Sequence, residues 1–324
     1  MIVRRTGFFD PTTAAILLAA VLLGVYAFME NGGLRRDNPS EPSTLPFDRA
    51  AVTKLGWNDR DINILLLGDS RTYMGVSPSA MRTVLPDVKI RNYAFRGLGF
   101  RGDYLDSTFG LVREASPPKM VVLGITTGSL TERSRRRNEW TTTMDGRGEG
   151  WSAKLDQSVD RIVPPTTPTG WVTRWTRRGN PGRRGAIHDY QTDGYCRSDS
   201  QPRRPNAAIA KTKLQFESTE ISSDTLADLY AFTDRCVDSG IIVVGFRPPA
   251  TRSMHDMEHQ TLGRAVERVA EGLIGRGGYW IDIPVGVHES YDGSHLTPEG
   301  ATGLSVQLAH RLQQIIASGP AARR

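Results

Sequence analysis

The apolar residues of this chain gather in short runs that are separated by longer stretches of mixed polarity. The clearest run, Ile64 to Leu67, has no polar interruption, which is typical of a strand buried on both faces of a parallel sheet. Further strands are predicted at Val88 to Tyr93, Lys119 to Gly124, Ile241 to Phe246, and Tyr279 to Ile283. The pattern therefore indicates about five parallel strands.

The stretches between these runs carry helical signals. After Thr297 and Pro298, a capping residue and a first-turn proline, an apolar stripe recurs at helical spacing: Leu304, Leu308, Leu312, Ile315 and Ile316. Other helices are predicted over residues 77–85, 102–114, 223–235 and 260–274. This alternation of strands and helices predicts an α/β fold with a doubly wound, flavodoxin-like parallel sheet between two helical layers.

The N-terminal segment divides into three parts ahead of the predicted domain. Residues 12–29 contain no charged residue and are close to the length that a membrane helix needs. We interpret them as an uncleaved membrane anchor, with a cleaved signal peptide as the alternative. Arg4 and Arg5 favour a cytoplasmic segment 1–11. Residues 30–46 then form a linker, and residues 47–324 form a domain outside the cytoplasm.

The segment 130–213 interrupts the regular pattern and is interpreted as an insertion over the edge of the sheet. It is rich in arginine and tryptophan, including Arg133, Arg135, Arg136, Arg137, Trp140, Trp151, Trp171 and Trp175. Aromatic rings stack on sugars, and guanidinium groups pair with carboxylates or phosphates. The insertion therefore suits a carbohydrate or an acidic polymer, and the alternative is a solvated excursion of the chain.

Two polar segments could carry chemistry. Gly68-Asp69-Ser70 follows the first strand directly, at the sheet edge where ligands bind in open α/β folds. Far along the chain, Asp292 precedes His295 by three residues, so that one turn can fold the carboxylate back onto the ring. Serine, histidine and aspartate in this relation perform nucleophilic catalysis. Taken singly, each segment is also compatible with an ordinary turn or a solvated loop.

Together the two segments resemble the SGNH, or GDSL-type, hydrolase superfamily, over roughly residues 60 to 316. The resemblance implies a three-layer α/β/α esterase in which Ser70 is the nucleophile, His295 the base and Asp292 the orienting carboxylate. It also implies that Gly97 donates its N–H to the oxyanion, with Gly99 as a competitor. The family's asparagine donor is replaced by Thr126, whose hydroxyl is the candidate substitute.

Membrane-anchored members of this superfamily that act in envelope polymer acylation are similar in architecture. The resemblance implies an esterase or acyltransferase for acyl groups, acetyl above all, on envelope carbohydrate, together with an envelope acylation machinery as partner. The alternative is a non-catalytic module that binds polysaccharide. Arg247 follows the fourth predicted strand at the same sheet edge and is a candidate for holding a substrate group.

Composition adds few constraints. The 324 residues are 38% hydrophobic, which is enough for a sizeable core, and the net charge of +6 favours anionic surroundings without indicating nucleic acid.

Cys196 and Cys236 could pair in an oxidising compartment or remain isolated thiols. His255 and His259 share a helical spacing, but no third ligand is evident in the sequence. A solvated helix face is therefore favoured over a metal site, and no metal is predicted. No phosphate-binding glycine loop is present, and no cofactor is predicted.

Overall fold

The central sheet consists of five parallel strands in the order β3-β2-β4-β7-β8. Along the chain they are β2 (Ile64–Gly68), β3 (Ile90–Asn92), β4 (Met120–Gly124), β7 (Ile242–Phe246) and β8 (Tyr279–Ile281). The first of these strands lies inside the sheet between the second and the third, as in flavodoxin-like folds. The predicted doubly wound α/β fold is confirmed.

The computed structural model describes residues 44–45, 51, 53–57, 61–136, 138–148, 186–204 and 206–318. These belong to the unit Thr44–Arg324. The predicted anchor at residues 12–29 and most of the predicted linker lie outside the described residues. Among the described helices, none has both the length and the apolar character required to cross a membrane.

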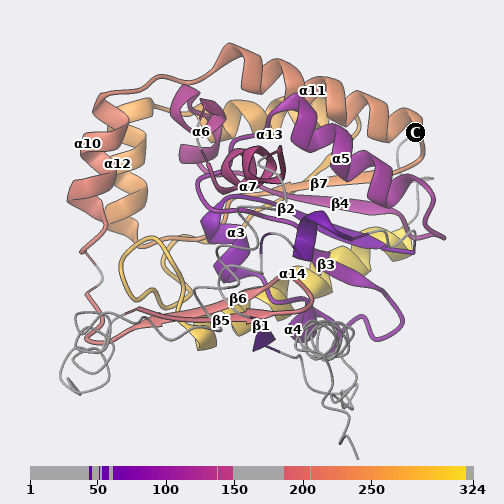
Figure 1. Cartoon of the computed structure of the whole chain (residues 1–324), viewed down its shortest axis with the longest axis horizontal. Helices are drawn as coiled ribbons and strands as arrows, with labels where there is room; N and C mark the ends of the chain where they lie inside the picture. The colour runs from indigo at the N-terminus through magenta and orange to yellow at the C-terminus, as the bar shows by residue number, and fades with distance from the viewer. Residues whose placement is uncertain are drawn as a thin grey trace, which may run out of the picture. The chain divides into compact units, whose positions relative to one another are not determined.

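Helices cover both faces of the sheet (Figure 1). Leu65 and Leu67 of β2 pack with α5 (Gly102–Arg113), α11 (Ser223–Asp238) and α13 (Ala265–Gly275). Ile64 and Leu66 point to the opposite side, where α4 (Pro78–Met81) and α14 (Pro298–Ser318) lie. Both faces are therefore buried, which explains why the sequence of β2 shows no alternation.

One predicted helix, over residues 260–274, is wrong in its limits. The structure has two helices there, α12 (Arg252–Leu262) and α13, separated by Gly263 and Arg264. Gly263 adopts a φ of +64°, a left-handed conformation that ends a helix and that glycine tolerates best. The apolar pattern alone did not reveal this break.

The predicted insertion 130–213 contains regular structure in its described parts. It includes α6 (Glu132–Arg136), α7 (Glu139–Gly148), β5 (Ala186–Gln191), β6 (Cys196–Ser200) and part of α10 (Ile209–Glu217). Strands β5 and β6 form an antiparallel sheet with β1 (Thr44–Leu45), separate from the central one (Figure 1). Residues 151–185, with three of the tryptophans named above, lie outside the described residues.

Trp140, on α7, is a core residue. Its side chain is 3% exposed, and its ring meets those of Tyr93, Phe95 and Tyr104 at centroid distances of 5.3–6.0 Å. The interpretation of Trp140 as a ring that stacks on substrate is therefore wrong. Trp140 packs α7 against Tyr104 of α5, so the start of the insertion contributes to the core of the domain.

The two cysteines are both buried and free. Cys236 belongs to the core cluster around α11, whereas Cys196 packs with Tyr73 and Tyr190 in a separate cluster. Of the two predicted alternatives, a disulfide and two isolated thiols, the structure has the isolated thiols.

We expect Trp140→Ala to lower the free energy of unfolding by about 3–5 kcal/mol, because it leaves a large cavity among packed aromatic rings. Met144→Ala is the matched control on the same helix, since Met144 is 42% exposed. Its effect should stay within about 0.5 kcal/mol. Urea denaturation of both variants measures the difference, and equal small effects would contradict a core role for α7.

Candidate active site

Ser70 is the first residue of α3 (Ser70–Gly75), directly after β2. The turn between strand and helix requires Gly68, whose φ is +145° and whose Cβ, if present, would lie 2.6 Å from the Gly124 carbonyl oxygen. Asp69 caps the helix by accepting the N–H of Arg71 at 2.9 Å. These constraints place the half-buried Ser70 side chain at the carboxyl edge of the sheet.

The three residues predicted as a triad are hydrogen-bonded to one another. Ser70 Oγ lies 2.9 Å from His295 Nε2, and His295 Nδ1 lies 2.8 Å from Asp292 Oδ2. Because a carboxylate accepts, Nδ1 carries the proton and Nε2 presents its lone pair to the serine hydroxyl. This is the tautomer that a general base requires.

Asp292 is held as a carboxylate. Burial would raise its pKa, but the hydrogen bonds that it accepts from the His295 ring and from the backbone of Ser294 and His295 hold the pKa below its ordinary value. The backbone N–H groups of Ser294 and His295 also donate to Oδ1, at 2.8 and 2.7 Å. The three-residue spacing therefore closes a turn that fixes both the carboxylate and the ring.

Ser70 and Gly97, which both line the cavity, each have a backbone N–H that is a candidate oxyanion donor. Within the part of the chain that the structure describes, neither the Ser70 N–H nor the Gly97 N–H has a hydrogen-bond partner. Gly97 has a φ of +64° and lines the same cavity as Ser70. Gly99, the competitor, donates its N–H to the Ser134 carbonyl at 3.1 Å. Gly97 is therefore the better candidate donor.

Thr126 does not fit its predicted function as an oxyanion donor. Its buried hydroxyl donates to Asp69 Oδ2 and accepts the N–H of Ser129, and its own N–H donates to Ser129 Oγ at 3.1 Å. Both donors are therefore already engaged. Thr126 instead holds the helix-capping Asp69, which positions the start of α3.

Arg247 is also placed differently from its predicted function in substrate binding. It is only 14% exposed, and it pairs with Glu258 at 2.8 Å and Glu267 at 3.4 Å. It is not among the residues that line the cavity at Ser70. Its charge is therefore committed to carboxylates of the protein.

Glu258, on α12, is the residue of this site that the sequence did not indicate. It is fully buried and forms ion pairs with both Arg71 and Arg247. Burial would raise its pKa, but the two guanidinium groups hold that pKa below its ordinary value. Arg71 Nε also donates to Ser294 Oγ at 2.9 Å, which connects α3 to the loop of Asp292 and His295.

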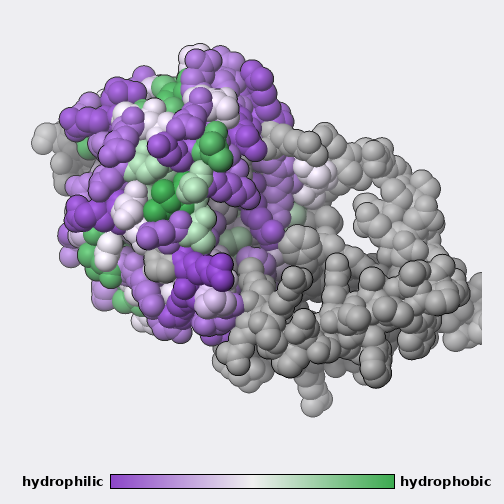
Figure 2. All heavy atoms as spheres, turned by 90° about the vertical axis from the view of Figure 1, so that its left-hand side faces the viewer, coloured by the Kyte–Doolittle hydropathy of each residue, from purple (hydrophilic) through white to green (hydrophobic). Residues whose placement is uncertain are grey.

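The cavity in front of Ser70 has a volume of about 550 Å³. One wall consists of α10, through Lys211, Thr212, Gln215 and Phe216, and Arg133 of α6 lies on another side. The face that presents α10 and α12 is mostly hydrophilic, with some apolar side chains near its middle (Figure 2). Apart from Asp69 and Asp292, no acidic residue lines the described cavity, so its outer part is basic.

Lys54 stabilises the loop that carries Gly97. Its Nζ donates to the Ala94 carbonyl at 2.6 Å and lies 3.5 Å from the centroid of the Tyr73 ring. Burial, partly offset by the charge of Glu139, lowers the pKa of Lys54 to about 7. Glu139 fixes the next part of the loop by accepting the N–H of Arg96 at 2.8 Å.

Metal-ligating side chains come together at one place among the described residues, outside the cavity lining. His255, His259 and Glu267 present ligand atoms that all lie within 4.8 Å of one another. The sequence indicated the two histidines but not Glu267, which lies across the break at Gly263.

Comparisons with known proteins found structural likeness but no sequence family. No model of a known protein family matches the chain, and no curated protein matches it. A carbohydrate acetylesterase from Sinorhizobium meliloti is similar with a TM-score of 0.38 and 10% identity, covering 78% of this chain and 98% of that one. An aryl esterase from M. smegmatis is similar with a TM-score of 0.37, 12% identity and the same coverage.

We expect Lys54→Met to remove a pH dependence of stability. The unfolded lysine keeps its proton up to its ordinary pKa of 10.5, whereas the folded one loses it near pH 7. Between these values the unfolded state binds more protons, so the wild-type chain gains stability relative to Lys54→Met as the pH rises, by up to ~1.4 kcal/mol per pH unit.

Chemical denaturation of both proteins at pH 7.5 and pH 9.5 measures this difference. Other groups titrate in both proteins and cancel in the comparison. A difference in unfolding free energy that stays constant with pH would contradict a buried, neutral Lys54.

Proposed function

We propose that this chain is a serine esterase or acyltransferase that acts on ester-linked acyl groups of envelope carbohydrate. The observation that carries the proposal is the hydrogen-bonded series Ser70–His295–Asp292, which opens into a cavity of about 550 Å³. A cavity of this size accommodates a sugar-sized alcohol as well as a short acyl group.

The geometry supports a two-step acyl transfer. Ser70 Oγ attacks the ester carbonyl carbon while His295 Nε2 takes its proton, and Asp292 stabilises the resulting imidazolium. The N–H groups of Ser70 and Gly97 stabilise the oxyanion. His295 then donates the proton to the departing alcohol oxygen, which leaves an acyl group on Ser70. Water gives hydrolysis, and a second alcohol gives transfer.

The commitment of Thr126 to Asp69 leaves two oxyanion donors where the family pattern has three. One such donor is worth about 2.7–4 kcal/mol of barrier lowering. We therefore expect slow turnover with simple activated esters, compared with esterases that have three donors. The polar and basic outer cavity favours substrates that add binding contacts through a hydrophilic alcohol part.

The location is part of the proposal. The uncharged stretch 12–29, preceded by Arg4 and Arg5, supports a membrane anchor with the domain outside the cytoplasm, next to an envelope acylation machinery. A C-terminal alkaline phosphatase fusion should be active in that orientation. The alternative function, a binding module without catalysis, is favoured only by the engaged Thr126, and the intact contacts of Ser70 oppose it.

We expect a fluorophosphonate probe to label the wild-type chain and not Ser70→Ala, because the probe reacts with an activated serine hydroxyl. Asp292→Asn should retain Ser70 but lower kcat for p-nitrophenyl acetate by about 10⁴-fold, since the ring loses the partner that sets its tautomer. Ser318→Ala, at an exposed serine at the end of α14, is the control outside the triad. Labelling that persists in Ser70→Ala would refute the proposal.

We expect Arg133 and Lys211, the basic rim of the cavity, to favour substrates whose alcohol part is negatively charged. The double variant Lys211→Gln and Arg133→Gln should lower kcat/KM about fivefold for an acetylated uronic acid, since two exposed ion pairs together contribute about 1 kcal/mol. The value for a neutral acetylated sugar should not change. The wild-type preference should also decline with added salt. Equal effects on both substrates would exclude charge recognition at this rim.

A further inference from the structure

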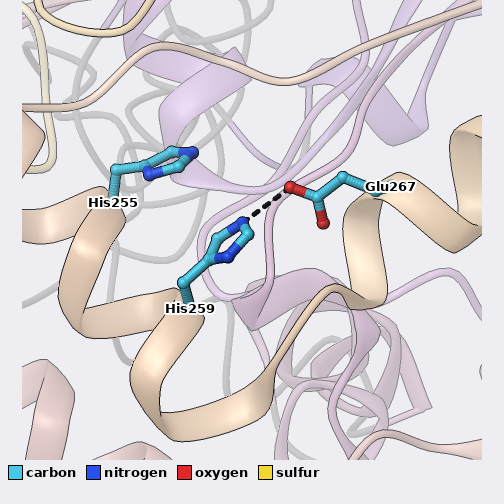
Figure 3. A group of neighbouring side chains, drawn as sticks. All are labelled: His255, His259 and Glu267. Carbon is cyan, nitrogen blue, oxygen red and sulfur yellow. Dashed lines mark hydrogen bonds and ion pairs between the residues drawn. The ribbon is translucent and has the colours of Figure 1, made fainter.

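His255, His259 and Glu267 form a cluster with the composition of a metal site. The histidines lie one turn apart on α12, and Glu267 projects toward them from the first turn of α13 (Figure 3). The two rings are stacked at a centroid distance of 4.8 Å, and all three ligand atoms lie within 4.8 Å of one another. Two imidazoles and one carboxylate are a ligand set found in zinc sites.

One nitrogen of the cluster, His255 Nε2, already has a lone pair, which a metal ligand requires. Arg247 Nη1 lies 2.9 Å from His255 Nε2, and because a guanidinium only donates, Nε2 carries a lone pair, which accepts from Arg247. His259 Nε2 lies 2.6 Å from Glu267 Oε1 and is therefore protonated. A shift of its proton to Nδ1 would free a second nitrogen.

The cluster already holds a positive charge. The same Arg247 nitrogen lies 3.4 Å from Glu267 Oε1, so the guanidinium contacts one imidazole and the carboxylate at once. Its other terminal nitrogen pairs with Glu258 at 2.8 Å. Arg247 can thus withdraw from the cluster and still keep a carboxylate partner. The three ligand side chains are between 25% and 32% exposed, which leaves a path for an ion from solvent.

We propose that His255, His259 and Glu267 bind one divalent transition-metal ion of the Zn²⁺ class, in competition with the guanidinium of Arg247. Metal–ligand distances of about 2.0–2.2 Å require the three atoms to approach one another slightly, and water would complete the coordination. The ion would cross-link α12 to α13 on either side of Gly263. None of the three ligands lines the cavity at Ser70, so the site does not depend on the proposed esterase function.

Titration of the tag-free full chain with Zn²⁺, by calorimetry and by competition with a chromogenic chelator, tests the site. We expect one ion per chain and a higher Tm in its presence, because an ion that binds only the folded state stabilises it. His255→Gln, His259→Gln and Glu267→Gln should each weaken binding at least tenfold. His310→Gln, at an exposed histidine on α14, is the matched control and should bind as the wild type does.

Arg247→Gln tests the competition and should bind Zn²⁺ more tightly than the wild type. If this variant does not fold, Co²⁺ provides the second measurement, since its visible absorption bands report nitrogen and oxygen ligands directly. These bands should appear with the wild-type chain and be lost in His259→Gln. Absence of saturable binding at micromolar Zn²⁺, or binding by the three ligand variants that is as tight as that of the wild type, would overturn the proposal.

Discussion

The arrangement around Ser70 depends on one buried charge, the carboxylate of Glu258. Its side chain has no contact with solvent, and Arg71 and Arg247 compensate its charge from α3 and from the end of β7. Loss of one partner of a buried ion pair typically costs about 3–5 kcal/mol, so these segments must stay together. Since Arg71 also bonds to Ser294, the same requirement aligns α3, which begins at Ser70, with the loop of Asp292 and His295.

Arg247 connects this network to a second group of side chains. One of its nitrogens pairs with Glu258, and the other contacts His255 and Glu267. A change in the charge at the histidine cluster therefore acts on a residue that also compensates Glu258. The connection is short, because α12 carries both Glu258 and the two histidines.

Thr126 stands where the resemblance implies an asparagine donor, and its hydrogen bonds have a structural effect. Its hydroxyl stabilises Asp69, which is buried and caps the helix that begins at Ser70. The loop that carries Gly97 is likewise stabilised, by Lys54 at Ala94 and by Glu139 at Arg96. In the proposed mechanism, preorganised N–H groups are effective because they need no reorganisation during the reaction, and these contacts would supply that preorganisation.

The parallel sheet, its doubly wound topology and the two segments that carry Ser70, Asp292 and His295 could be predicted from the sequence, because buried strands and a three-residue turn are local patterns. Which groups occupy the other positions around them depends on the packing of elements that are distant along the chain. Glu258, Lys54 and Glu267 act on residues that are distant in sequence or lie across a helix break, and Trp140 and Arg247 proved to be internal. Such pairings depend on which side chains the packed elements bury against each other, and no periodicity along the chain encodes that choice.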